Sequence, residues 1–235
     1  MNRPAIFCLL ATLLGAQATA PEVEITNEPH HHLTFENKSV RVFNVQVDPN
    51  TETLTHWHRH DYIAITLAPA EISNTVKEKP PVTVKFSEGD TRFTPATFAH
   101  FVRDVGPGPF RNVTIELLED EALRSATPKW DEDRGLAVLN NGTKQILFVK
   151  DAIRATEFEL QPGGAVPMHR HAGPHLLVAV TDLDLRDDVQ GNRGMQGLMP
   201  SHFKSGDSRW FIANYNHALT NIGTKAAKFV TLEFP

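Results

Sequence analysis

The chain has 235 residues, 40% of them hydrophobic, with a formal net charge of −5 and a mean hydropathy of −0.29. This length fits one or two globular domains, and the charges are scattered, which excludes the basic stripe of a nucleic-acid-binding protein. Past the N-terminus there is no apolar run of about 18 residues, so we expect no membrane-spanning helix. The expected partner is therefore a small-molecule substrate or ligand. Neither nucleic acid nor a membrane is expected, and homo-oligomer formation stays open.

Residues 1–18 have the features of a secretory signal peptide. Arg3 gives a short positive start, residues 5–15 form an apolar run, and an A-x-A pattern ends at Ala18. We predict cleavage after Ala18 and a secreted or periplasmic protein, with a buried N-terminal helix as the alternative. Cys8 is the only cysteine and would leave with this segment. The mature chain would then form no disulfide and offer no thiolate to a metal.

Short segments typical of β-strands dominate the rest of the chain, and no segment has a long apolar pattern of period 3.6. These segments are rich in β-branched and aromatic residues and are bounded by Gly, Pro, Asn or Asp. They cover residues 40–47, 63–67, 82–86, 146–149, 176–180 and 229–234. The best helix candidate, 118–125, overlaps the charged segment 119–140, which we interpret as an inter-domain linker. An all-β domain of this size avoids exposed edge strands by closing into a barrel or a jelly roll.

The chain contains an internal duplication. A Gly-Asp pair precedes His100, with the glycine eleven residues before it, and a second Gly-Asp pair precedes His217 at the same distance. The copies are offset by 117 residues here and by 113 residues further upstream. Self-similarity of this kind indicates two equivalent domains. We therefore predict two tandem all-β barrels, at residues 19–118 and 141–235.

Each copy also carries a His-x-His pair seven residues after a proline. The pairs are His56 and His58 in the first copy, and His169 and His171 in the second. Alternate residues of a strand face the same side, so both imidazoles of a pair point into the same interior. The histidine past each Gly-Asp pair comes from a distant strand of the same domain and completes each set.

One further candidate follows each pair. His175 shares the strand parity of the second pair and His60 that of the first, whereas the residue aligned with His175 is Tyr62, a much weaker ligand. The predicted metal ligands are therefore His56, His58, His60 and His100 in the first copy and His169, His171, His175 and His217 in the second. Imidazoles without thiolates suit a divalent transition metal, namely Fe, Cu, Zn or Ni, with Mn also open. We expect tighter binding in the second copy. The alternative is a packed histidine core without metal.

Other polar residues fall outside this pattern. The run His30-His31-His32 lacks a partner, so we expect it to be a solvated segment or an adventitious metal binder, and we expect His202 on the surface. Arg92 and Arg209 each follow a Gly-Asp pair. We interpret them as bracing the aspartate of the turn, with an anchor for an anionic substrate as the alternative.

These motifs resemble those of the cupin superfamily. Its first motif is a Pro-Gly turn, His-x-His and then a glutamate, and its second is Gly-Asp, a strand and a turn leading to a histidine. The resemblance spans nearly the whole mature chain, as a bicupin. It implies two jelly-roll barrels, each with a metal facing the lumen and open positions for water, dioxygen or substrate. The motif glutamate is replaced by His175 in one copy and by Tyr62 in the other. The usual set of three histidines and one glutamate is therefore absent.

The expected function is that of a secreted or periplasmic metal-binding bicupin, acting as a transition-metal-dependent dioxygenase or related enzyme on a small molecule. One alternative is a non-catalytic protein that sequesters or senses a metal or small ligand. Another is a carbohydrate-binding module with vestigial sites. The sequence identifies no catalytic residue, and a fold shared by many functions does not choose among these.

Overall fold

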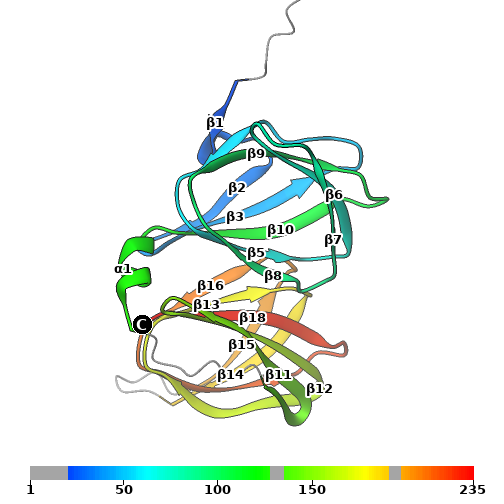
Figure 1. The fold of residues 1–235 in the computed structure, drawn as a ribbon. Coiled ribbons are helices and arrows are strands. Elements are labelled where there is room, and N and C mark those ends of the chain that lie inside the picture. The colour runs from blue at the N-terminus through cyan, green and yellow to red at the C-terminus, as the bar shows by residue number, and fades with distance from the viewer. Residues whose placement is uncertain (1–20, 128–134, 191–196) are drawn as a thin grey trace, which may run out of the picture.

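The computed structural model describes residues 21–127, 135–190 and 197–235, and the expected signal peptide lies outside them. The N-terminal repeat forms two five-stranded sheets, in the orders β1-β4-β9-β6-β7 and β2-β3-β10-β5-β8. Its elements are β1 (Val23–Glu24), η1 (Ile25–Asn27), β2 (His31–Glu36), β3 (Val40–Val47), β4 (His56–His58), β5 (Tyr62–Thr66), β6 (Ala70–Val76), β7 (Val82–Phe86), β8 (Thr91–Thr94), β9 (Phe98–Asp104) and β10 (Phe110–Leu117). Together the two sheets form the upper half of the molecule in Figure 1.

The C-terminal repeat follows a short helix, α1 (Asp120–Ser125), which lies within the segment expected to be the linker. One curled sheet has the order β15-β14-β17-β12-β18-β13-β16, and β11 pairs with β12. The strands are β11 (Leu136–Lys150), β12 (Ile153–His171), β13 (His175–Ala179), β14 (Leu183–Val189), β15 (Gly197–Phe203), β16 (Ser208–Phe211), β17 (Tyr215–Asn221) and β18 (Ala227–Glu233). β11 begins before residue 141, the expected start of the second domain. In Figure 1 this repeat is the lower half.

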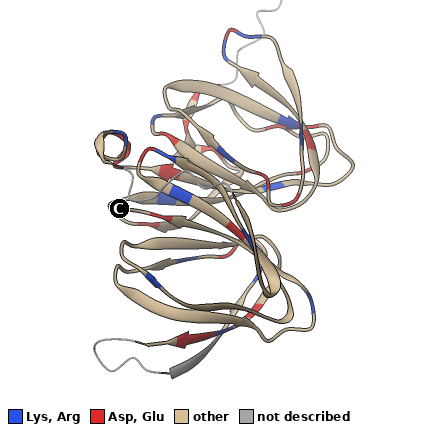
Figure 2. Ribbon diagram, turned by 60° about the horizontal axis from the view of Figure 1, so that its bottom comes forward, with Lys and Arg blue, Asp and Glu red and all other residues tan. Residues whose placement is uncertain are grey.

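The chain is all-β, with two tandem jelly-roll barrels, which confirms the predicted fold class. The closing strand of each repeat joins strands that are distant in sequence, β10 pairing with β3 and β5, and β18 with β12 and β13. Charged residues of both signs are scattered over the strands and loops (Figure 2). In the described part of the chain, no helix is long and apolar enough to cross a membrane.

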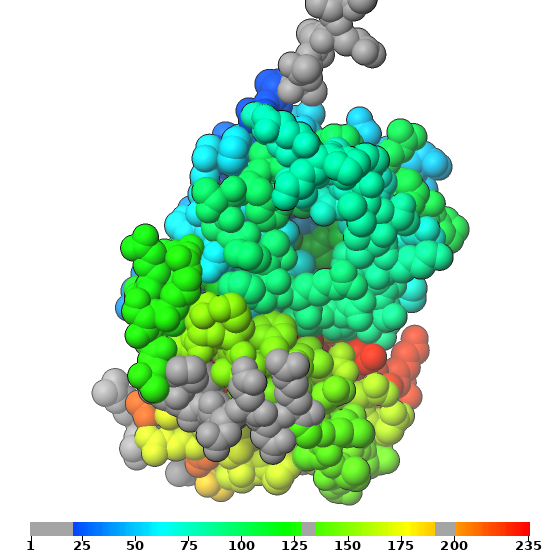
Figure 3. Space-filling view, in the orientation of Figure 1, coloured from blue at the N-terminus to red at the C-terminus, as the bar shows by residue number. Residues whose placement is uncertain are grey.

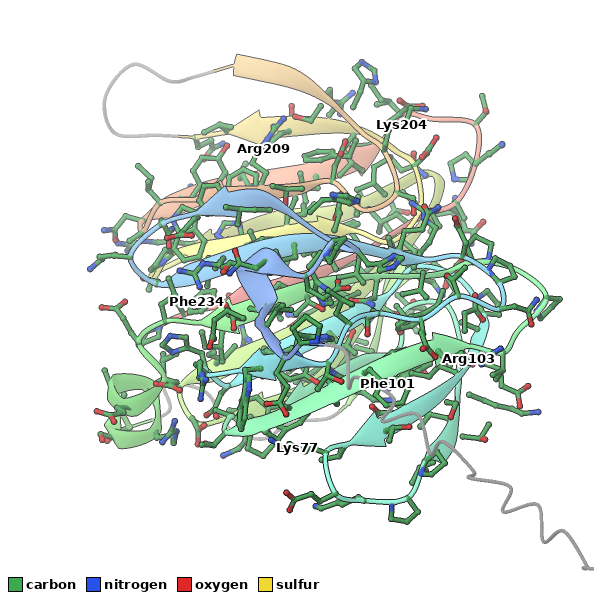
Figure 4. All side chains as sticks on the ribbon, turned by 90° about the horizontal axis from the view of Figure 1, so that it is seen from above. Lys77, Phe101, Arg103, Lys204, Arg209 and Phe234 are labelled. Carbon is green, nitrogen blue, oxygen red and sulfur yellow. The ribbon has the colours of Figure 1, made fainter. Side chains whose placement is uncertain are left out.

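Strand alternation gives the closing strands two buried faces. On β10, Phe110 points into the N-terminal barrel, where it joins an interior cluster with Phe43 and Val47. The residues of β10 that face the other way, including Ile115, join a second cluster. This second cluster contains residues of both repeats, such as Leu232. Phe234, which is labelled in Figure 4, is the last residue of the C-terminal repeat in this second cluster. The two barrels therefore share one apolar interface.

The Gly-Asp turn of each repeat lies against the other repeat. A Cβ on Gly89 would lie 2.5 Å from Oε2 of Glu157, and a Cβ on Gly206 would lie 3.4 Å from the side-chain amide of Asn44. Asn44 and Glu157 occupy equivalent positions, 113 residues apart. Both glycines also have positive φ angles, 87° and 99°, which other residues adopt only with strain. The repeated glycine therefore serves the turn and the docking together.

Two polar contacts cross this interface in matching positions. Arg111 donates a hydrogen bond to the carbonyl oxygen of Ser205 at 3.1 Å, and Nζ of Lys228 lies 3.7 Å from Oε1 of Glu88. Lys228 follows Arg111 by 117 residues, as Ser205 follows Glu88, so each contact is the counterpart of the other. The repeats are thus packed about a pseudo-two-fold axis, in the manner of a symmetric dimer.

Candidate metal centres

Three histidines converge inside the N-terminal barrel. His56 and His58 lie on β4, and His100 lies directly opposite His56 on β9. All three are buried, with 1%, 2% and 7% of their surface exposed. One ring nitrogen from each lies within 4.8 Å of the others, and Nε2 of His58 is 3.0 Å from Nε2 of His100.

The C-terminal barrel repeats this arrangement with the equivalent residues. His169 and His171 end β12, and His217 lies opposite His169 on β17. Their nitrogens also lie within 4.8 Å of one another, with Nε2 of His169 and Nε2 of His171 2.9 Å apart. The three residues that the motifs share are therefore brought together in both repeats.

Both triads contain buried ring nitrogens without a partner among the described residues. These atoms are Nε2 of His56 and Nδ1 of His58 in the N-terminal triad and Nε2 of His217 in the C-terminal one. Buried polar atoms are normally hydrogen-bonded, and an uncompensated one destabilises the fold. A metal ion accepting these lone pairs would satisfy them, and imidazole nitrogen suits the divalent transition metals. The residues present thus fit a metal, and each triad can hold one transition-metal ion.

Burial keeps these imidazoles neutral. It lowers the pKa of His56 to about 4 and that of His169 to about 4, well under the usual 6.5. Burial also lowers the pKa of His58 and of His100, with the charges of neighbouring histidines adding to the shift. A neutral imidazole is the form that binds metal, so these four residues are ready to ligate at neutral pH.

In the N-terminal site, neutral oxygen atoms hold the outer ring nitrogens. Nδ1 of His56 is 2.9 Å from the carbonyl oxygen of Leu54, and Nδ1 of His100 is 2.7 Å from Oδ1 of Asn74. Nδ1 of His58 has no partner among the described residues. Donation from Nδ1 leaves Nε2 with a free lone pair that faces the centre of the triad.

In the C-terminal site, two carboxylates take this role. Nδ1 of His171 is 2.8 Å from Oε1 of Glu233, and Nδ1 of His217 is 2.9 Å from Oδ1 of Asp187. Asp187 occupies the position of Asn74, and it also accepts a hydrogen bond from Oη of Tyr215 at 2.9 Å. Carboxylates behind metal-binding imidazoles make them more basic and fix their orientation.

Two predicted ligands lie outside these triads. The ring of His175 stacks on His171 at a centroid distance of 3.7 Å, and Tyr62 stacks in the same way on His58 at 4.1 Å. The alignment of Tyr62 with His175 thus agrees with the structure, but both rings cover a ligand face. The side chain of His60 is 34% exposed, with Nδ1 3.9 Å from Oδ2 of Asp120 in α1. The structure does not bring His60 into the site.

One histidine near the N-terminal triad was missed by the sequence reasoning. The expectation of a solvated His30-His31-His32 run is wrong for His31, whose side chain is only 6% exposed. Nδ1 of His31 is 2.6 Å from Oε2 of buried Glu28, and its ring centroid lies 4.7 Å from that of His56. The glutamate three residues upstream was the available sequence signal. His202 is on the surface as expected, with its side chain 70% exposed.

The two matched arginines differ in their contacts. Nη2 of Arg92 lies 3.4 Å from Oδ2 of Asp90, as the bracing interpretation expects, but its side chain also lines the N-terminal cavity. Nη1 of Arg209, labelled in Figure 4, instead donates to Oγ of Ser201 at 2.9 Å. Each guanidinium also lies over a phenylalanine ring of its own repeat, at 4.3 Å for Arg92 and 4.5 Å for Arg209.

The barrels differ most in the space in front of the triads. The N-terminal triad lines a cavity of about 470 Å³, whereas the cavity at the C-terminal triad measures about 10 Å³. Figure 3 shows a hollow in the face of the N-terminal repeat. The C-terminal barrel is filled by Phe158 and Phe229, whose rings stack at 5.0 Å. The equivalent N-terminal residues, Val45 and Asn112, are smaller and leave the cavity open.

Comparison with known proteins identifies the fold and not the activity. The sequence matches no protein-family model and no curated protein. Solved structures do match: AerE from Microcystis aeruginosa has 13% identity and a TM-score of 0.62, covering 88% of this chain and 93% of that one. Oxalate decarboxylase from Bacillus subtilis has 14% identity and a TM-score of 0.61, covering 84% and 68%. Another oxalate decarboxylase structure, from work on its Mn(II) centres, has 12% identity and a TM-score of 0.62, covering 90% and 76%. The chain therefore has the cupin fold.

Proposed function

We propose that this two-repeat cupin-fold protein is a secreted metal-dependent enzyme that oxygenates a small molecule in its N-terminal cavity. The observation that carries the proposal is the contrast between the two triads. The N-terminal one lines a cavity of about 470 Å³, a size typical of small-molecule sites, and the C-terminal one is closed. Catalysis is assigned to the open site, and the closed site would hold its metal as a structural element.

The metal in the open site would be held by His56, His58 and His100. Such an ion, when bound, supplies a Lewis acid and, if it is iron or copper, a centre able to exchange electrons. The chain holds the imidazoles in place with the Leu54 carbonyl and the Asn74 amide. Tyr62 covers one face of His58, and burial raises the pKa of its phenol to about 12, so it remains neutral. It therefore shields the site and supplies no charge.

The cavity walls indicate the chemistry of the substrate. They are mainly apolar, and the charged residues that line them in the described structure are Arg92 and Lys79, with no carboxylate. Asn112 and Thr114 add hydrogen-bonding groups on β10. A substrate with an apolar body and one anionic or polar group suits this lining, because the walls exclude water and the two cations favour negative charge.

Secretion is proposed from the sequence of residues 1–18. The charged start, the apolar run and the A-x-A pattern support it, and the described residues contain no cysteine that an oxidising compartment would affect. Expression of the full chain in a bacterial host, followed by N-terminal sequencing of the secreted fraction, tests this. A protein that stays uncleaved inside the cell would contradict it.

The activity is tested on the chain without a histidine tag, loaded separately with iron, copper, manganese and zinc. Oxygen uptake is measured with a panel of small aromatic and aliphatic acids. We expect uptake with a redox-active metal, its loss in His58→Ala, and its retention in His171→Ala. The alternative, a protein that sequesters a metal or small ligand, is favoured by the closed C-terminal site. It would show bound metal and bound panel compounds without uptake.

A further inference from the structure

The N-terminal triad has one more imidazole beside it, from a strand outside both cupin motifs. We propose that His31 on β2 is the fourth metal ligand of the N-terminal site and that Glu28 holds it in place. This proposal depends on the metal site proposed above. It would give the first repeat the fourth ligand that Tyr62 cannot supply.

His31 lines the same cavity as the three histidines of the triad. It lies opposite Val45 in the β2–β3 pairing, and both side chains line the cavity. Its ring centroid is 4.7 Å from that of His56, with an angle of 58° between the planes. Within the triad, His56 is 5.1 Å from His58 and 4.6 Å from His100, with angles of 62° and 63°. His31 thus meets His56 with a spacing and tilt close to those of the two triad partners, and it lies beside the three residues whose nitrogens are within 4.8 Å of one another.

Glu28 holds the ring of His31 in place. Its carboxylate is buried, and Oε2 takes the Nδ1 contact of His31 at 2.6 Å. The same carboxylate accepts hydrogen bonds from the backbone N–H of His30 at 2.8 Å and of Leu54 at 3.1 Å. The carboxylate is therefore fixed from three sides. Because Nδ1 is committed to it, Nε2 is the nitrogen left to face the cavity, as in the carboxylate–imidazole–metal arrangement.

The C-terminal repeat shows that this feature is specific to the N-terminal site. The residue equivalent to His31 is Lys144, which pairs with Phe158 as His31 pairs with Val45. A protonated lysine has no lone pair for a metal. In the C-terminal site the carboxylates lie behind His171 and His217, whereas in the N-terminal site the carboxylate lies behind His31. Each site would therefore contain at least one imidazole held by a carboxylate.

The test uses Co(II) as the probe and the mature full chain carrying His169→Ala and His217→Ala, so that only the N-terminal site binds. Affinity is measured by competition with a chelator, and the visible d–d spectrum reports the number and type of ligands. We expect His31→Gln to weaken Co(II) binding about tenfold or more and to change the spectrum. His32→Gln, an exposed neighbour on the same strand, should alter neither.

Two further variants keep the outcome clear. His31→Lys retains a partner for buried Glu28 while removing the ligand, so it tests the proposal if His31→Gln fails to fold. Glu28→Gln should weaken binding in the same direction by a smaller factor. Folded His31 variants with the affinity and spectrum of His32→Gln would overturn the proposal. His58→Ala serves as the reference: Co(II) bound there as in the parent would overturn the metal site itself, and with it the proposed function.

Discussion

The two repeats place the same three histidines at the same positions and surround them differently. Behind the N-terminal imidazoles lie a carbonyl and an amide, whereas carboxylates lie behind two of the C-terminal ones. In front of the N-terminal triad is a cavity of about 470 Å³, and in front of the other is a stacked aromatic pair. The fold thus fixes where the ligands are, while the residues around them determine how tightly a metal is held and what can reach it.

The largest expected effect is loss of metal from one site at a time. His58→Ala should empty the N-terminal site and His171→Ala the C-terminal site, because each removes a buried ligand whose nitrogen lies within 3.0 Å of a second one. Elemental analysis after dialysis should fall from two metals per chain to one in each variant. Brief chelator treatment of the parent should remove the N-terminal metal first. Preferential loss from the C-terminal site would reverse the comparison.

Two histidines predicted from sequence as ligands provide the matched controls. His60→Ala should leave the metal content unchanged, because its side chain is one-third exposed and faces α1. His175→Ala should also retain the C-terminal metal, because its ring lies flat on His171 and Phe211 instead of converging with the triad. Metal lost from His175→Ala to the same extent as from His171→Ala would show that the fourth C-terminal ligand is His175 after all.

The next largest effect is expected from variants that fill the N-terminal cavity or open one in the C-terminal barrel. The double variant Val45→Phe, Asn112→Phe copies the C-terminal aromatic pair into the N-terminal barrel, and we expect it to abolish ligand binding and turnover while keeping the metal. Ligand binding is measured by calorimetry and metal by elemental analysis. Phe158→Ala should instead open a cavity in the C-terminal barrel. We expect it to lower the free energy of unfolding by about 3–5 kcal/mol. Unchanged turnover in the double variant would place the substrate elsewhere.

An intermediate effect comes from exchanging the residues behind the ligands. Asp187→Asn gives the C-terminal site the amide of the N-terminal one, and we expect metal affinity to fall roughly 10- to 100-fold. Asn74→Asp makes the reverse change and should strengthen the N-terminal site. Both are measured by chelator competition with the other site disabled. If each variant binds metal as tightly as its own parent with the same site disabled, these partners only orient the rings.

The smallest effect expected is on the stability of the metal-free protein at low pH. Folding lowers the pKa of His56 and of His169 to about 4, so the unfolded chain takes up protons first as the pH falls below about 6.5. The stability is therefore complete above that pH and is lost progressively toward pH 4. We expect the Tm of the metal-free protein to drop by at least several degrees between pH 7.5 and pH 5. A metal-loaded sample, whose imidazoles are occupied, should drop less.

Much of this arrangement follows from sequence periodicity. The parity of the His-x-His pairs and the offsets of 113 and 117 residues predict both triads and the equivalence of Tyr62 and His175. What the periodicity cannot supply is the direction in which each further side chain turns. His60 has the parity of a ligand but lies after the end of β4, where the chain has left the strand. His31 lacks a repeated partner and reaches the site through the β2–β3 register, which no local pattern encodes.

The cavity was also beyond local patterns, because it depends on pairs of residues that meet across strands. Val45 and Asn112 are far apart in the sequence and lie opposite each other in the β3–β10 pairing, as Phe158 and Phe229 do between β12 and β18. Either pair suits a strand, so propensity does not distinguish an open barrel from a filled one. Only the pairing of strands shows that two aromatic rings meet in the C-terminal repeat, and that two smaller side chains meet at the equivalent position of the N-terminal repeat.

The reciprocal packing of the Gly-Asp turns has a consequence for how the protein responds to dilution. A symmetric dimer of single repeats would separate at low concentration, since its association is a second-order process. Here the partner is supplied by the same polypeptide at a high and fixed effective concentration. The interface that Gly89 and Gly206 complete therefore persists at any concentration. If the chain is secreted as proposed, dilution outside the cell would leave its two halves together.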